Sequence, residues 1–159
     1  MSRNFRFVLA LALLIPAGLP AAPSRADLEK IVDFSATLKT LAAAASGEAS
    51  LPSKIIILDG TVSDINILDR EQATFRARVE LLSGEWIGTD EVMSYACYVD
   101  FRGAEFFDAF PARAPRSPTP GVVLANSRVL IAGRVLGFAT SPQGEKRVLV
   151  EGLLVRTIR

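Results

Sequence analysis

The spacing of hydrophobic and polar positions changes once along the chain, near residue 54. Between residues 27 and 45 the apolar side chains recur at steps of three and four, which is the period of an amphipathic helix. Asp27 is a suitable N-cap and Gly47 a suitable stop. The pattern therefore predicts one helix over 27–45, followed by a polar connector that contains Pro52.

From Lys54 onward apolar and polar residues alternate with a period of two, which predicts strands over 54–62, 73–82, 93–101, 128–138 and 147–158. In the second strand Arg76 and Arg78 should point outward, and the inward positions are Ala73, Phe75, Ala77, Val79 and Leu81. In the third strand Tyr98 should point outward, and the inward positions are Met93, Tyr95, Cys97, Val99 and Phe101. Glycines inside the last two strands indicate the sharp coiling that lets a small sheet close on itself.

The segment between the third and fourth predicted strands has two parts. Residues 104–110 carry Phe106, Phe107 and Phe110 and are expected to form one or two helical turns that plug the core, with one ring left exposed. Residues 111–121 contain four prolines and should form a surface loop, because proline cannot donate to a sheet.

One helix, three strands, an interrupted crossover and two more strands favour a mainly β fold. We expect a small five-stranded closed barrel preceded by the amphipathic helix, with a β-sandwich as the alternative. Residues 129–137, with the turn and strand that follow, are similar to the end of the tRNA-anti-like branch of the OB-fold superfamily, and the resemblance covers 54–159. It implies a ligand surface on the outward side of the second and third strands and on the adjoining loops.

The first 26 residues are typical of an export signal. Arg3 and Arg6 precede an apolar run from Phe7 to Ile15, and after two prolines Ser24-Arg25-Ala26 fits a cleavage site. We expect a cleavable signal peptide over 1–26, a helix and connector over 27–53 and the barrel domain over 54–159. The protein would then be periplasmic or secreted, without a stable membrane span after processing; the alternative is an uncleaved anchor.

Histidine is absent and Cys97 is the single cysteine, so the usual zinc sites and the His-dependent nucleophilic mechanisms cannot be assembled. We expect no metal, no cofactor and a buried Cys97. A carboxylate pair of Glu85 with Asp90 or Glu91 is the remaining catalytic possibility, but nothing in the sequence fixes its separation, and the prediction is that the chain is not an enzyme.

Residues 64–69 resemble the start of a calcium loop. Leu68 and Asp69 occupy positions that need an oxygen ligand and a glycine, so a polar turn is the better interpretation.

Charge argues against nucleic acid as a partner. Removal of residues 1–26 takes away three arginines and no acidic residue, which changes the formal charge from +1 to −2. The first functional hypothesis is therefore a non-enzymatic periplasmic module that binds a protein or envelope component. The alternative is an OB-type binder of oligosaccharide or single-stranded nucleic acid. Its candidate binding residues are Trp86, Tyr98, Arg76 and Arg78.

Overall fold

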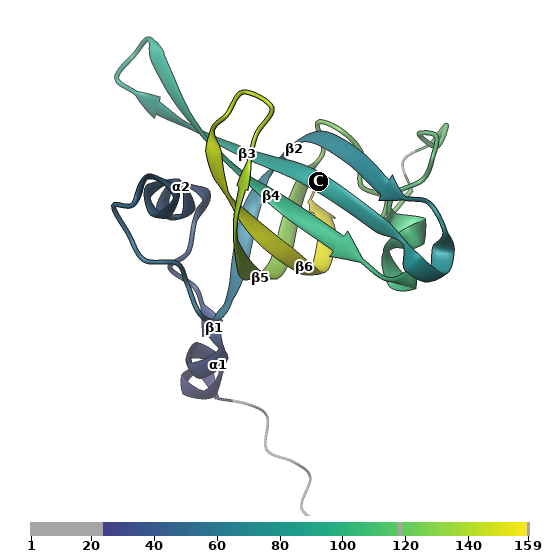
Figure 1. Cartoon of the computed structure of the whole chain (residues 1–159), viewed down its shortest axis with the longest axis horizontal. Coiled ribbons are helices and arrows are strands. Elements are labelled where there is room, and N and C mark those ends of the chain that lie inside the picture. The colour runs from purple at the N-terminus through teal and green to yellow at the C-terminus, as the bar shows by residue number, and fades with distance from the viewer. Residues whose placement is uncertain (1–23, 118, 159) are drawn as a thin grey trace, which may run out of the picture.

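The computed structural model describes residues 24–117 and 119–158, so most of the expected signal peptide lies outside the described residues. Its central feature is a closed barrel of five strands: β2 (Ile55–Asp69), β3 (Arg76–Ile87), β4 (Glu91–Arg102), β5 (Arg128–Thr140) and β6 (Lys146–Ile158). The strands follow the order β2-β3-β4-β6-β5, and β2 also pairs with β5, which closes the sheet (Figure 1). Every barrel pairing is antiparallel except the parallel pairing of β4 with β6. The predicted barrel is confirmed, and the sandwich alternative is wrong because one sheet closes on itself.

The first predicted strand is much longer than the sequence pattern indicated. β2 runs on through residues 64–69, where a polar turn was expected, and Ile65 and Ile67 in that stretch pack against the core. The C-terminal half of β2 pairs with β3, and Asn66 of β2 lies opposite Arg78 of β3. The turn prediction is wrong because alternating apolar and polar residues continue the strand through 64–69. A calcium site of the kind considered needs a loop at these residues, and the structure has a strand there.

The inward positions of the second and third predicted strands form the core at the centre of the barrel. Buried there are Phe75, Ala77, Val79, Leu81, Cys97, Val99 and Phe101. Three expectations fail at the ends of these strands. Ala73 is exposed in a short 3-10 turn, η1 (Gln72–Thr74), and Met93 is exposed and Tyr95 half-buried because β4 begins beyond the barrel. Burial raises the pKa of the Cys97 thiol to about 12, as expected of a structural cysteine.

Two glycines allow the barrel to close. Gly133 of β5 lies opposite Gly152 of β6, next to a shift in the register of these strands. A Cβ at Gly152 would overlap the ring of buried Phe101, and a Cβ at Gly133 would lie 2.6 Å from the carbonyl oxygen of Glu151. At both glycines a neighbouring group lies so close to the backbone that a larger residue would not fit, which agrees with the expected role of strand glycines in coiling the sheet.

The single helix expected over 27–45 is divided into α1 (Arg25–Ile31) and α2 (Leu38–Ser46), separated by the short strand β1 (Val32–Asp33), which pairs with the start of β2. The break has local causes. The Asp33 carboxylate accepts hydrogen bonds from the Ser35 backbone nitrogen (2.9 Å) and hydroxyl (2.6 Å), which forms a turn. Thr37 and Thr40 then make a capping box that begins α2. These polar interactions override the apolar period.

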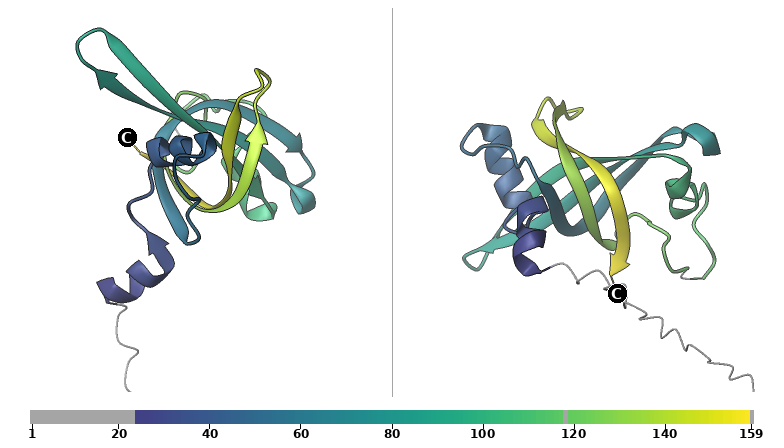
Figure 2. Two further views of the ribbon diagram at one scale, coloured as in Figure 1. Left: turned by 60° about the vertical axis from the view of Figure 1, so that its left-hand side comes forward. Right: turned by 90° about the horizontal axis from the view of Figure 1, so that it is seen from below.

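α2 and the 3-10 helix η2 (Ala104–Ala109) lie at opposite ends of the barrel (Figures 1 and 2). α2 buries Leu38, Leu41 and Ala44, whereas the η2 end buries Phe106 and Phe110 against Phe101, with ring centroids 5.0 and 5.1 Å apart. The expected plug is confirmed, but none of the three rings is exposed, because Phe107 is half-buried. In the described part of 111–121 most residues are exposed, as expected of a surface loop.

Among the residues that the structure describes, no helix has the length and apolar character needed to cross a membrane.

Candidate functional site

Tyr98 lies near the middle of the outward side of β3, β4 and β6, which we call the Tyr98 face. It is opposite Glu80 on β3 and Leu149 on β6. Two guanidinium groups flank its ring: the Cζ of Arg78 is 5.7 Å from the ring centroid and that of Arg147 is 5.5 Å away. Both are within the range of cation–π attraction. The face therefore presents an aromatic ring between two positive charges.

Arg78 is held in place by a buried carboxylate. Its Nε and Nη2 donate hydrogen bonds to the two carboxylate oxygens of Asp100, at 2.6 and 3.0 Å. The Asp100 side chain is only 2% exposed, and Arg102 Nη2 lies 3.6 Å from Oδ2 of the same carboxylate. These bonds raise the pKa of Arg78 and fix the plane of its guanidinium group. Asp100 lies on the outward side of β4, but Arg78 and Arg102 cover it.

Arg147 is anchored in the same way on the other side of the ring. It forms ion pairs with Glu80 and with Glu145, the latter at 2.8 Å, and the Ser63 hydroxyl donates to Glu80 at 2.7 Å. Sequence reasoning missed Arg147 because the parallel pairing of β4 with β6 joins segments far apart in the chain. Arg102 could have been found, since it continues the outward alternation of the third predicted strand.

Arg76 and Arg102 are directly opposite each other on β3 and β4 at the η2 end of the face. Both are exposed, and within the described residues Arg76 has no carboxylate at ion-pair distance. Like charges directly opposite in a sheet are destabilising. Bound between them, an anion would relieve that repulsion.

Trp86 does not belong to this face. The β3–β4 hairpin continues past the barrel as a two-stranded arm, residues 84–94, which projects away from the body (Figures 1 and 2). Trp86 is six residues beyond the partner of Tyr98 on β3, or about 20 Å along the strand. Trp86 is 70% exposed, so it does not fold back over the barrel end. The structure thus brings together Tyr98, Arg78 and Arg76 but places Trp86 elsewhere.

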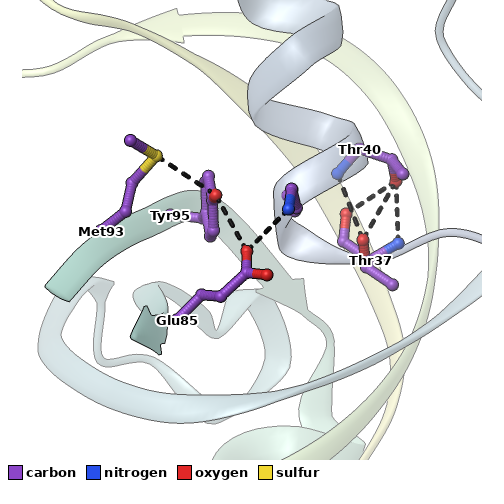
Figure 3. A network of polar contacts seen from close by, with 6 residues as sticks. Thr37, Thr40, Glu85, Met93 and Tyr95 are labelled. Carbon is purple, nitrogen blue, oxygen red and sulfur yellow. Dashed lines mark hydrogen bonds and ion pairs between the residues drawn. The ribbon is translucent and has the colours of Figure 1, made fainter. Parts of the chain in front are cut away.

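The base of the arm is tied to α2 by Glu85. Its carboxylate accepts hydrogen bonds from Lys39 Nζ at 2.7 Å and from the Tyr95 hydroxyl at 3.1 Å (Figure 3). Both bonds lower the pKa of Glu85, whereas a glycosidase acid needs a raised one. Glu85 is thus occupied in a structural contact. Within the described residues there is also no cluster of three side chains able to hold a metal ion.

No family model and no curated protein matches the sequence. Solved structures do resemble the fold. A small single-stranded DNA-binding protein from Streptomyces coelicolor is 10% identical over 68% of this chain and 94% of its own, with a TM-score of 0.41. The single-stranded DNA-binding protein of Plasmodium falciparum, in complex with DNA, is 12% identical over 70% and 98%, with a TM-score of 0.43. An asparaginyl-tRNA synthetase from Entamoeba histolytica is 16% identical over 69% of this chain, which spans 22% of the synthetase, with a TM-score of 0.43.

The barrel is OB-like. Five strands in this order, with a helical turn between the third and fourth, make the closed Greek-key barrel that the sequence resemblance implied. Identities this low describe the fold alone.

The expectation of a module that binds a protein or envelope component, with nucleic acid an unlikely partner, is contradicted, because the single-stranded DNA-binding proteins named above are among the similar structures. Net charge alone does not describe this face. Net charge averages over the whole surface, whereas four arginines of this OB-like barrel gather on or beside the Tyr98 face: Arg76, Arg78, Arg102 and Arg147.

Proposed function

We propose that the chain binds single-stranded nucleic acid across the Tyr98 face, without catalysing a reaction. The observation that carries the proposal is the Tyr98 ring flanked by two anchored guanidinium groups on the face that OB-folds use for ligands. Base stacking on aromatic rings and on arginine planes is the usual means of holding unpaired bases. The bonds to Asp100 and Glu80 keep both arginines ordered before a ligand arrives, which reduces the entropy lost on binding.

The charges suit a phosphate backbone contact at one end of the face. Arg78 and Arg147 each pair with a carboxylate, and Arg102 lies 3.6 Å from the carboxylate that Arg78 already binds. Arg76 forms no ion pair within the described residues, so Arg76, with Arg102 directly opposite, is left as the main phosphate contact. Between Tyr98 and Arg102 the strand covers about 13 Å, the length of roughly four stacked nucleotides. This matches the lower end of the site sizes, about 4–16 nucleotides, found for single OB-folds.

Fluorescence polarisation with a labelled DNA or RNA strand of about 12 nucleotides tests the proposal. Replacement of Tyr98→Ala should weaken binding by about 5- to 150-fold, since stacking contributes about 1–3 kcal/mol per base. Tyr98→Phe keeps the ring and should bind nearly as the parent does. One phosphate neutralised between Arg76 and Arg102 predicts a slope of about −0.7 for log affinity against log salt concentration.

Other results would refute the proposal. A neutral oligosaccharide bound with no salt dependence would assign the face to glycans instead. If the Tyr98→Ala variant and the parent bind with equal affinity, the nucleic acid binds to a surface other than the Tyr98 face.

We also propose that the chain is exported, on the strength of its N-terminal sequence pattern. The expected cleavage point after Ala26 falls inside α1, whose capping box joins Ser24 to Asp27. Cleavage would remove that cap and the Arg25–Glu29 ion pair, so the processed protein should have less helix. Mass spectrometry of the protein recovered from outside the cytoplasm should show Asp27 as the first residue. An intact Met1 there would indicate a retained anchor, and recovery only from the cytoplasm would refute export.

A further inference from the structure

A pocket opens at the η2 end of the barrel, beside the Tyr98 face and separate from it. Its volume is about 360 Å³, and we call it the phenylalanine pocket; it is lined by Ile67, Arg70, Phe75, Phe107, Asp108, Phe110, Pro111 and Ala112. Pockets that hold small ligands span about 300–1,000 Å³. The space is therefore sufficient for one small ring system rather than for a chain of them.

The pocket has aromatic walls that the core holds in place. Phe75 and Phe110 are buried and stack with centroids 6.1 Å apart, and Phe107 meets Phe75 edge-on at 5.7 Å. Phe107 is half-buried, so part of its ring faces the pocket and solvent. Rigid aromatic walls favour a flat guest that can stack or meet them edge-on.

The rim carries one group of each charge. Arg70 and Asp108 are exposed, and within the described residues neither forms an ion pair. Arginine donates hydrogen bonds to ring nitrogens and carbonyl oxygens of bases, and a carboxylate accepts from an exocyclic amino group. A flat ring with both donors and acceptors on its edge, as in a nucleobase, fits this combination better than a plain hydrocarbon does.

The pocket and the proposed phosphate contact are neighbours along the chain. Arg76 directly follows the wall residue Phe75, whose carbonyl accepts a hydrogen bond from the backbone nitrogen of Gly103 at 3.0 Å. Arg102 directly precedes Gly103, so this backbone bond lies beside the Arg76–Arg102 pair. A phosphate between the two arginines would therefore lie one residue along the chain from the wall residue Phe75.

We propose that the phenylalanine pocket holds one unstacked base of a bound strand, whose adjacent phosphate lies between Arg76 and Arg102. The proposal rests on the function proposed above and adds a base-binding subsite to it. Arg70 and Asp108 contact the edge of that base, and Phe107 contacts its plane.

The test compares Phe107→Leu with the parent chain. Leucine keeps apolar volume but removes the flat ring, and Phe138→Leu is a matched control, since Phe138 is an exposed phenylalanine on β5 outside the pocket. Phe107→Leu should lower the affinity for a strand of about 12 nucleotides at least fivefold. Its affinity for a strand of the same length without bases should not change, and Phe138→Leu should behave as the parent.

A second measurement keeps the pocket and the strand-binding function distinguishable. NMR titration of the full chain with nucleoside 5′-monophosphates should shift the amide signals of Arg70, Phe107 and Asp108. A strand that binds tightly, and equally well to Phe107→Leu, would overturn the pocket and leave the function standing. If the mononucleotides shift these amide signals but no strand binds, the proposed strand-binding function is overturned and the pocket remains a site for a single nucleotide. Absence of both would overturn both.

Discussion

Closure of the barrel depends on a glycine at residue 152, and Gly152→Ala is the most direct perturbation of it. An added Cβ would overlap the ring of Phe101, with Cζ only 2.8 Å away. The ring is fully buried between Phe106 and Phe110, whose centroids are 5.0 and 5.1 Å from its own. It cannot turn aside without displacing the aromatic residues at the η2 end.

The expected loss of stability combines two opposite effects. Insertion of a methyl group into a packed core costs about 1–3 kcal/mol. Replacement of glycine by alanine recovers about 0.4–1 kcal/mol, because the unfolded chain loses freedom and the backbone at Gly152 is not in the left-handed region. The net destabilisation should be about 1–2 kcal/mol, or a fall in Tm of about 3–6 °C for a domain of this size.

Urea unfolding followed by circular dichroism measures the effect, and Gly84→Ala is the matched control. Gly84 also lies in a strand, but it is exposed on the arm, where a Cβ would stand 3.2 Å from a side-chain atom of Val92. Its change in stability should be within about 0.5 kcal/mol. In a Phe101→Leu background the Gly152→Ala penalty should shrink, because the smaller side chain makes room. An unchanged stability of Gly152→Ala, or strict additivity with Phe101→Leu, would refute the proposed overlap.

Three further predictions concern the core and its polar contacts. Arg78→Met leaves the buried Asp100 carboxylate with Arg102 alone, so the free energy of unfolding measured in urea should fall by about 1.5–3 kcal/mol. The double variant Arg78→Met/Asp100→Leu should recover part of that loss, because the buried charge is gone. A larger loss in the double variant would contradict this. Because the folded-state pKa of Cys97 is raised from 9.0 to about 12, its contribution to stability should be complete below pH 9 and lost as the pH rises toward 12. A Cys97→Ala variant should lose less stability over that range, and parallel pH curves would refute the assignment. Thr37→Ala removes the side-chain cap of α2 and should lower the free energy of unfolding by about 1 kcal/mol. An unchanged urea midpoint would contradict this prediction.

Local patterns predicted the fold well wherever one face of a strand alone meets the core. The inward residues from Phe75 to Leu81 are an example, because every second side chain must avoid water. The split between α1 and α2 was not predictable from apolar spacing, since it depends on the Asp33 turn and on the pairing of Val32 with Ile55. The arm was missed for a related reason: neither of its faces packs on the core, so its strands lack the alternation that the interpretation relied on.

The candidate site was half predictable. Tyr98, Arg76 and Arg78 were found because they share the outward side of two neighbouring strands. Arg147 reaches the Tyr98 ring through the parallel pairing of β4 with β6, a long-range contact that periodicity does not encode. Trp86 was grouped with them on chemistry alone, and the length of the hairpin separates it.

A charge of −2 after processing is compatible with nucleic-acid binding when the acidic groups are examined individually. Asp100 and Glu80 each hold an arginine against Tyr98, so they subtract from the net charge while they order the stacking surface. Such a face gains little from counterion release and more from stacking, which implies a shallow salt dependence. Removal of Asp100 would raise the net charge and yet should weaken binding, because Arg78 would lose its fixed orientation. Net charge therefore predicts tighter binding after this substitution, whereas the geometry of the anchored arginines predicts weaker binding.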